Sequence, residues 1–110
     1  MDTPESPGAY LLYFGLLCVL APVAEEIVFR GFVHGGLRSV LPPGWAALLS
    51  ALVFSGAHLP GTTEALVVVA ALGFALGLLY EHTRSIVPGI LIHALHNALV
   101  LTVMIAAAAM

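Results

Sequence analysis

The sequence predicts an all-α protein, a polytopic transmembrane helical bundle with about four membrane segments. Of the 110 residues, 61% are apolar and only 8% are charged, and the mean hydropathy is +1.09. A soluble domain carries about 25% charged residues, so this chain lacks the polar side chains that a water-facing surface needs. Its apolar runs have helical length and are separated by prolines, glycines and short polar stretches.

The first predicted helix is the longest. Residues 1–7 are predicted to be a flexible N-terminus, and residues 8–110 to form a single domain. The helix covers about residues 9–41, which is more than the ~20 residues that a bilayer crossing requires. Pro22 lies inside it, and because proline removes a helix hydrogen bond, a kink is predicted there.

Three further helices are predicted at about residues 44–58, 62–80 and 85–109. Prolines and glycines separate the first three helices, and the polar stretch 81–85 forms the last connection. The second and third helices are short for a crossing, which indicates tilt or a partial crossing.

Two glycine pairs, Gly31 with Gly35 and Gly73 with Gly77, have the G-x-x-x-G spacing. This spacing lets helix backbones approach closely in a bilayer, where no hydrophobic force drives helices together. Close helix contacts are therefore expected at both pairs.

The charged residues indicate the partners and the orientation. With only three basic residues and a net charge of −3, the chain has no basic patch for nucleic acid, so the lipid bilayer is the expected environment. Arg38 and Arg84 flank alternate connections, which places both on one side of a four-helix layout; the positive-inside rule makes that side cytoplasmic. The small size favours a prokaryotic cell membrane.

Three polar clusters interrupt the apolar segments. They read Glu25-Glu26-x-x-x-Arg30, Phe54-x-x-x-His58 and His93-x-x-His96-Asn97. A charged residue at mid-bilayer costs at least ~2.5 kcal/mol, so such residues usually face a cavity and mark function. With a rise of about 1.5 Å per residue, Glu25, His58 and Asn97 all lie about 20 Å from the predicted cytoplasmic ends.

Spacing within the clusters suggests their tasks. Residues four apart share a helix face, which pairs Glu26 with Arg30 and aligns His93 with Asn97. The ion pair favours structural support by Arg30, although Glu26 stays a candidate catalytic residue, and it leaves Glu25 available to a water. A carboxylate in an apolar site is a good general base, and imidazole or amide N–H groups can stabilise an oxyanion.

Other hydrolytic signatures are absent from the sequence. The zinc motif H-E-x-x-H does not occur, and no Ser or Cys has the context of a nucleophile elbow, so covalent catalysis is not expected. A metal remains open, because Glu25, His58 and His93 could supply three ligands of an open site for a divalent metal such as Zn²⁺.

In this order on successive helices, the three motifs resemble the CPBP intramembrane endopeptidases. That family includes type II CAAX prenyl proteases and Abi-like proteins of bacteriocin processing and self-immunity, and the resemblance covers about residues 15–105. It implies that Glu25 and His58 activate a water, while His93 and Asn97 form the oxyanion site. Descriptions of the family as metalloproteases would make the same residues ligands. It also implies a longer protein with further helices around this core.

Two functions follow as hypotheses. The first is an intramembrane endopeptidase that hydrolyses a peptide bond of a hydrophobic or prenylated CAAX-type substrate. The alternative is a catalytically idle membrane protein that binds a peptide or acts in bacteriocin self-immunity. The intact motifs favour the first, because a binding protein has no need for a base, a water-orienting imidazole and oxyanion donors together. A proton or ion pathway ranks last.

Overall fold

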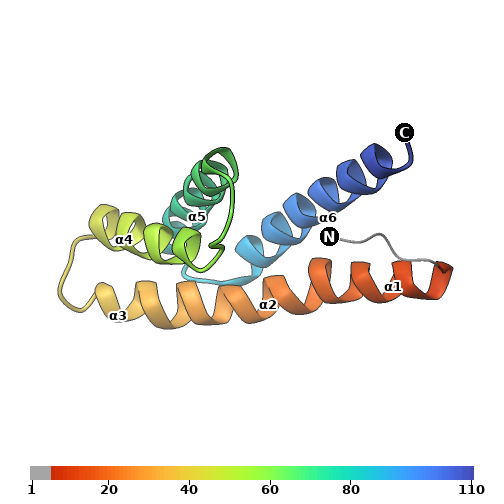
Figure 1. Ribbon diagram of the computed structural model, residues 1–110. Helices are drawn as coiled ribbons and strands as arrows, with labels where there is room; N and C mark the ends of the chain where they lie inside the picture. Colours follow the sequence, from red (N-terminus) through yellow and green to blue (C-terminus); the bar gives the residue numbers. More distant parts are fainter. Residues whose placement is uncertain (1–5) are drawn as a thin grey trace. The chain divides into compact units, whose positions relative to one another are not determined.

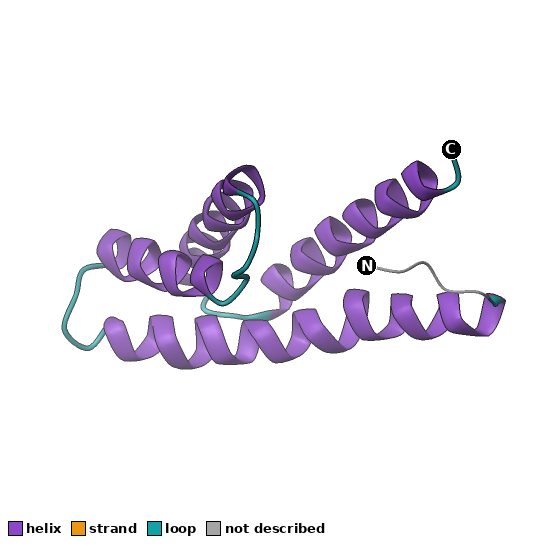
Figure 2. Cartoon of the chain, viewed as in Figure 1, coloured by secondary structure: helices purple, strands orange, loops and turns teal. Residues whose placement is uncertain are grey.

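A computed structural model describes residues 6–110, and nearly all of them are helical (Figures 1 and 2). The first helix, Pro7–Leu37, is 31 residues long. It consists of α1 (Pro7–Gly15), η1 (Leu16–Leu20), α2 (Ala21–Glu26), η2 (Ile27–His34) and α3 (Gly35–Leu37), where η1 and η2 are π-helical. The remaining helices are α4 (Pro43–Gly56), α5 (Thr63–Thr83) and α6 (Val87–Ala108).

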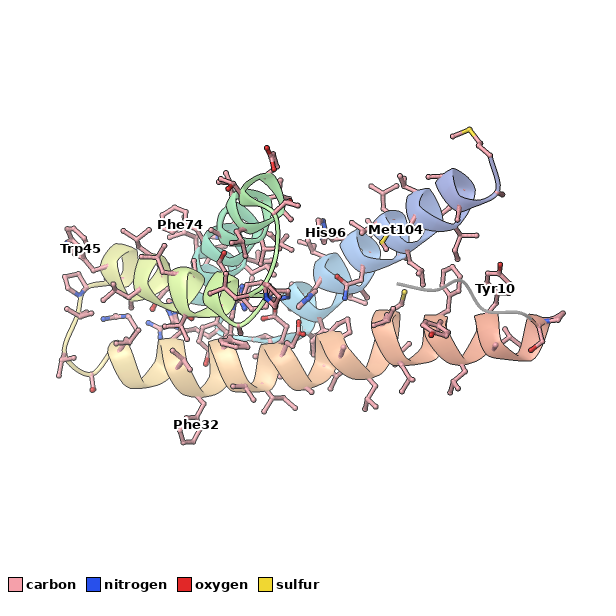
Figure 3. The ribbon with its side chains drawn as sticks, viewed as in Figure 1. Tyr10, Phe32, Trp45, Phe74, His96 and Met104 are labelled. Carbon is pink, nitrogen blue, oxygen red and sulfur yellow. The ribbon has the colours of Figure 1, made fainter. Side chains whose placement is uncertain are left out.

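These helices confirm the predicted all-α membrane fold. The first helix, α5 and α6 are each long and apolar enough to cross a membrane. Helix α4 has 14 residues and a length of about 21 Å, which is less than the ~30 Å of the hydrocarbon core. Large apolar side chains such as Phe32 (81% exposed) and Trp45 (60%) point outward (Figure 3). The protein is therefore an integral membrane protein whose exposed apolar surface faces lipid.

Both ends of the first helix differ from the prediction. Ser6 is its N-cap and accepts a hydrogen bond from the Ala9 N–H at 3.2 Å, while Pro7 occupies the first turn, where its missing N–H is not needed. Residues 1–5 of the predicted flexible segment lie outside the described residues. The helix ends at Leu37, earlier than residue 41, because the hydrogen bonds from Ser39 N–H to the Gly36 carbonyl and from Val40 N–H to the Leu37 carbonyl span three residues and interrupt the four-residue pattern.

The kink predicted at Pro22 stays a prediction, while the hydrogen bonding of the first helix is irregular both before and after this residue. Proline cannot donate to the carbonyl four residues earlier, and the hydrogen bonding is π-type at Leu16–Leu20 and again at Ile27–His34. The helix continues through Pro22 and does not end there. Single π-helical turns are frequent at functional sites, and the second stretch directly follows Glu25 and Glu26.

Helix α5 runs past its predicted end at residue 80, so the predicted connection at 81–85 is wrong in its first half. Glu81 belongs to the last turn of the helix, which ends at Thr83. Arg84 then adopts a left-handed conformation (φ 56°), and its N–H bonds the Tyr80 carbonyl at 2.7 Å. This arrangement is a common way to satisfy the last carbonyls of a helix.

The chain divides into two compact units, Glu25–Gly89 and Met1–Ala24 with Ile90–Met110. In the Glu25–Gly89 unit, α4 packs along α5, and η2 and α3 contact that pair. Two serines of α4 bond across to its neighbours: Ser50 donates to the Phe29 carbonyl at 2.9 Å, and Ser55 donates to the Leu66 carbonyl at 2.8 Å. The single domain expected for residues 8–110 remains a prediction.

Small residues bring α4 and α5 together. A Cβ built on Gly73 would lie 2.9 Å from Phe54 Cδ1 and 3.2 Å from Ala51 Cα, and one on Gly77 would lie 3.0 Å from Ala47 Cβ. These separations leave no room for a methyl group at either glycine. The G-x-x-x-G prediction is thus confirmed for the pair on α5.

The same prediction is wrong for the other glycine pair. A Cβ on Gly31 would have no neighbour within 4 Å among the described residues, and one on Gly35 would meet only the Arg30 carbonyl of its own helix. Both glycines are exposed, so they mediate no close helix contact in residues 6–110.

Candidate active site

Arg30 is the polar centre of the Glu25–Gly89 unit. It is 1% exposed, and its Nε lies 3.3 Å from Oε2 of Glu26. Its Nη2 donates to the Gly73 carbonyl at 3.0 Å, and its guanidinium carbon lies 4.8 Å from the centre of the Phe54 ring. The guanidinium thereby joins η2 to both α5 and α4. The structure contains the Glu26–Arg30 pair that the spacing predicted.

Both carboxylates of the first motif lie near this guanidinium. Glu26 is fully buried, and a Cβ built on Gly89 would lie 3.5 Å from its Oε2. Glu25 is half-buried and also interacts electrostatically with Arg30. Both carboxylates of the first motif thus interact with one guanidinium.

His58 lies in the turn that follows α4. Its Nδ1 donates to the Phe54 carbonyl at 2.7 Å, and its ring meets the Phe54 ring edge-to-face, with centres 4.9 Å apart and planes at 76°. His58 is exposed, whereas Phe54 is buried against Arg30. The structure therefore connects the second motif to the first through one aromatic ring.

The third motif belongs to the other unit. His93 is buried on α6, and Asn97, one helical turn further on, donates from Nδ2 to the Leu17 carbonyl at 2.7 Å. That hydrogen bond ties α6 to η1. His96, half-buried and labelled in Figure 3, lies off the shared face of His93 and Asn97.

The candidate metal ligands do not form a ready cluster. Over residues 6–110, no three His, Cys, Asp or Glu side chains are grouped closely enough to hold a metal ion. Glu25 and His58 belong to one unit and His93 to the other.

A second polar cluster was missed in the sequence. The buried His34 places Nε2 2.9 Å from Oε1 of Glu81, and Arg38 donates to the same oxygen from Nε. Arg84 Nη2 lies 3.6 Å from the other carboxylate oxygen, Oε2. Glu81 lies within ion-pair distance of both Arg38 and Arg84. The two connections that carry these arginines therefore lie at one end of this unit, as expected if both are on the same side of the membrane.

The sequence did contain a signal for part of this cluster. Glu26, Arg30, His34 and Arg38 follow at four-residue intervals, which marks one polar face of the first helix. The predicted connection at 81–85 put Glu81 outside a helix, so Glu81 was not identified as the partner of that face.

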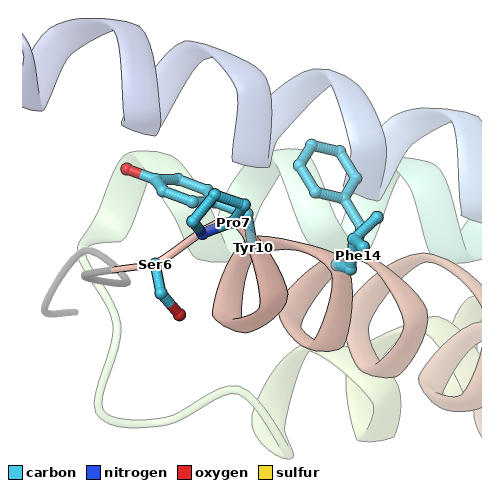
Figure 4. A pocket seen from close by; sticks show the side chains of 5 residues that line it. Ser6, Pro7, Tyr10 and Phe14 are labelled. Carbon is cyan, nitrogen blue, oxygen red and sulfur yellow. The ribbon is translucent and has the colours of Figure 1, made fainter.

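An open hollow of about 550 Å³ lies on α1 (Figure 4). Its lining is Ser6, Pro7, Tyr10, Leu11 and Phe14. It is largely apolar and contains none of the candidate catalytic residues, so it has no group suited to activating a water.

Comparison with known proteins decides the family. Residues 7–99 match the profile described as "Type II CAAX prenyl endopeptidase Rce1-like". The chain belongs to the Rce1-like family. This membership confirms the resemblance to type II CAAX prenyl proteases that the motifs indicated.

One relative is "Putative membrane peptidase YdiL" of Bacillus subtilis (strain 168), which is 30% identical over 82 residues. The aligned part covers 74% of this chain and 33% of the relative, so the chain spans about a third of that protein's length. No solved structure matches the chain.

Proposed function

We propose that the protein is an intramembrane endopeptidase that hydrolyses a peptide bond of a hydrophobic or prenylated, CAAX-type substrate. The observation that supports the proposal is a series of contacts within one unit: Glu26 pairs with Arg30, Arg30 lies over the Phe54 ring, and Phe54 contacts His58. Glu25 interacts electrostatically with the same Arg30. Membership of the Rce1-like family supports it.

In the proposed reaction, Glu25 is the general base. A water, oriented by His58, gives one proton to the Glu25 carboxylate while its oxygen attacks the scissile carbonyl carbon. The tetrahedral intermediate collapses, the C–N bond breaks, and the proton passes from Glu25 to the leaving nitrogen. General acid–base catalysis of this kind contributes typically 10²- to 10⁴-fold.

The oxyanion of the intermediate needs N–H donors, and His93 and Asn97 are the proposed ones. An amide side chain has two N–H groups. Asn97 uses Nδ2 for the Leu17 carbonyl, which leaves its second N–H for an oxyanion. Glu26 is the proposed partner of Arg30 in the site, and the pair is proposed to hold the first helix in position.

A divalent metal such as Zn²⁺, held by Glu25, His58 and His93, is the alternative way in which these residues would activate a water. A catalytically idle binding or self-immunity protein is the alternative for the whole chain. The proposed setting is a prokaryotic cell membrane with the connections at Arg38 and Arg84 in the cytoplasm, which their shared contact with Glu81 supports.

The test is cleavage by the purified protein in detergent of a farnesylated CAAX peptide, its unprenylated counterpart and a panel of hydrophobic peptides. Glu25→Gln is compared with Glu64→Gln, a matched change in the first turn of α5. Glu25→Gln is expected to lower kcat at least about 10²-fold, and Glu64→Gln to leave it unchanged.

Each outcome has a distinct meaning. Cleavage by a folded Glu25→Gln protein would overturn the role of the general base. A folded wild-type protein that cleaves no peptide would favour the binding or self-immunity alternative. Loss of cleavage on adding a chelator, with recovery on adding Zn²⁺, would establish the metal.

A further inference from the structure

We propose that Phe54 is the positioning residue of His58: its carbonyl selects the imidazole tautomer and its ring fixes the imidazole plane, so that Nε2 is the nitrogen offered to the water. The inference rests on the proposed function, in which His58 orients that water. It assigns a task to a side chain of the second motif for which the spacing of the motif indicated none.

The first part of the argument is the hydrogen bond at Nδ1. The Phe54 carbonyl oxygen lies 2.7 Å from Nδ1 of His58. A carbonyl can only accept, so in the neutral imidazole Nδ1 carries the proton and Nε2 carries the lone pair. A free histidine side chain holds its proton more often on Nε2, so this contact selects the less common form.

The second part is the ring contact. The Phe54 and His58 rings meet at 76° with centres 4.9 Å apart, which is the edge-to-face arrangement that aromatic rings favour. The carbonyl fixes one atom of the imidazole and the ring fixes its rotation about that atom. His58 needs both contacts because it is exposed and lies beyond the C-cap of α4.

The Phe54 ring is itself held in place. It is 1% exposed, with the Arg30 guanidinium 4.8 Å from its centre and the Phe29 ring centre 5.1 Å away at 67°. At Gly73 there is no space for even one additional methyl group against Phe54. Arg30 is fixed in turn by Glu26 and by the Gly73 carbonyl. The Phe54 ring therefore lies between the buried ion pair and the exposed imidazole and contacts both Arg30 and His58.

This geometry has a chemical consequence. With its lone pair on Nε2, His58 accepts a hydrogen bond from one O–H of a water, while the other O–H remains for Glu25. The opposite tautomer would present an N–H on that side, which would donate to the water oxygen and compete with its attack on the substrate carbonyl.

The tautomer is measured directly. Protein labelled with ¹⁵N-histidine is studied in detergent by two-bond ¹H–¹⁵N correlation, and the signal of His58 among the five histidines is identified by its loss in His58→Gln. The expected result is a proton on Nδ1. A proton on Nε2 would overturn the inference, and because the readout needs no substrate, it is independent of whether the protein is a protease.

Variants separate positioning from packing. Phe54→Leu keeps the backbone carbonyl and removes only the ring, so the proton is expected to stay on Nδ1 while kcat falls about ten- to hundredfold with KM unchanged. Phe54→Tyr keeps an aromatic ring and should retain most of the wild-type kcat. Phe29→Leu is the matched control, because it removes a ring that contacts Phe54 and not His58; it should lower kcat much less than Phe54→Leu.

A folded Phe54→Leu protein with the wild-type kcat would refute the positioning role of the ring. Equal loss in Phe29→Leu and Phe54→Leu would show that packing alone is involved. If Phe54→Leu does not fold, the tautomer of the wild-type protein and the kcat of Phe54→Tyr still test the inference. If no peptide is cleaved, the protease proposal fails while the tautomer result stands.

Discussion

Replacing Arg30 with methionine removes a guanidinium that makes three contacts and leaves the Glu26 carboxylate buried beside an apolar side chain. Glu26 and Arg30 are 0% and 1% exposed, so water cannot take the place of the lost partner. Breaking a buried ion pair from one side costs about 3–5 kcal/mol. This is a large part of the ~5–15 kcal/mol that stabilises a typical domain.

The double variant Glu26→Gln/Arg30→Met isolates the cause. It removes the buried charge together with its partner, and replacing a whole buried pair is often neutral or stabilising. We therefore expect the double variant to recover most of the loss, apart from the hydrogen bond to the Gly73 carbonyl. Glu26→Gln alone should affect stability more than chemistry.

The assay is the free energy of unfolding, from SDS titration in mixed micelles followed by far-ultraviolet circular dichroism. Arg84→Met is the control, since its side chain is 67% exposed and 3.6 Å from Glu81, and exposed pairs contribute about 0–1 kcal/mol. The reasoning is refuted if Arg30→Met is no less stable than Arg84→Met, or if the double variant is no more stable than Arg30→Met.

Three further predictions concern packing, the second polar cluster and depth. Gly73→Ala should lower the free energy of unfolding by about 1–3 kcal/mol through overpacking, whereas Gly31→Ala should leave it unchanged or raise it by up to ~1 kcal/mol. Chemical unfolding measures both values, and equal effects would contradict the close contact of Gly73 with α4. Glu81→Gln should destabilise by about 1–3 kcal/mol, because buried groups lose a charged acceptor, while Glu64→Gln should not; a stable Glu81→Gln protein would count against the cluster. Trp45, the single tryptophan, should be quenched by lipids brominated near the headgroup more than by lipids brominated at the chain ends, and quenching by aqueous iodide alone would place it outside the bilayer.

The helices and the first ion pair could be predicted from the sequence because both depend on local order. The apolar runs and the prolines between them predicted the four helices, and the four-residue spacing predicted the contact of Glu26 with Arg30 on one helix face. The other partners of Arg30 could not be predicted, because the Gly73 carbonyl and the Phe54 ring come from α5 and α4, and their register depends on packing.

The errors have the same physical origin. A polar residue such as Glu81 indicates a loop only if it faces water, and here it faces His34 and Arg38. Glycine spacing cannot tell whether a helix face meets another helix, so Gly31 with Gly35 and Gly73 with Gly77 looked equivalent although only the second pair is packed.

The hydrogen bond from Asn97 to Leu17 has a consequence for biosynthesis. It joins residues 80 positions apart, and the whole Glu25–Gly89 unit is encoded between them. A ribosome therefore synthesises every residue of that unit before it adds Asn97, the partner of Leu17. Since chains fold from the N-terminus as they emerge, the unit with the proposed base is complete first, and the proposed oxyanion donors arrive last.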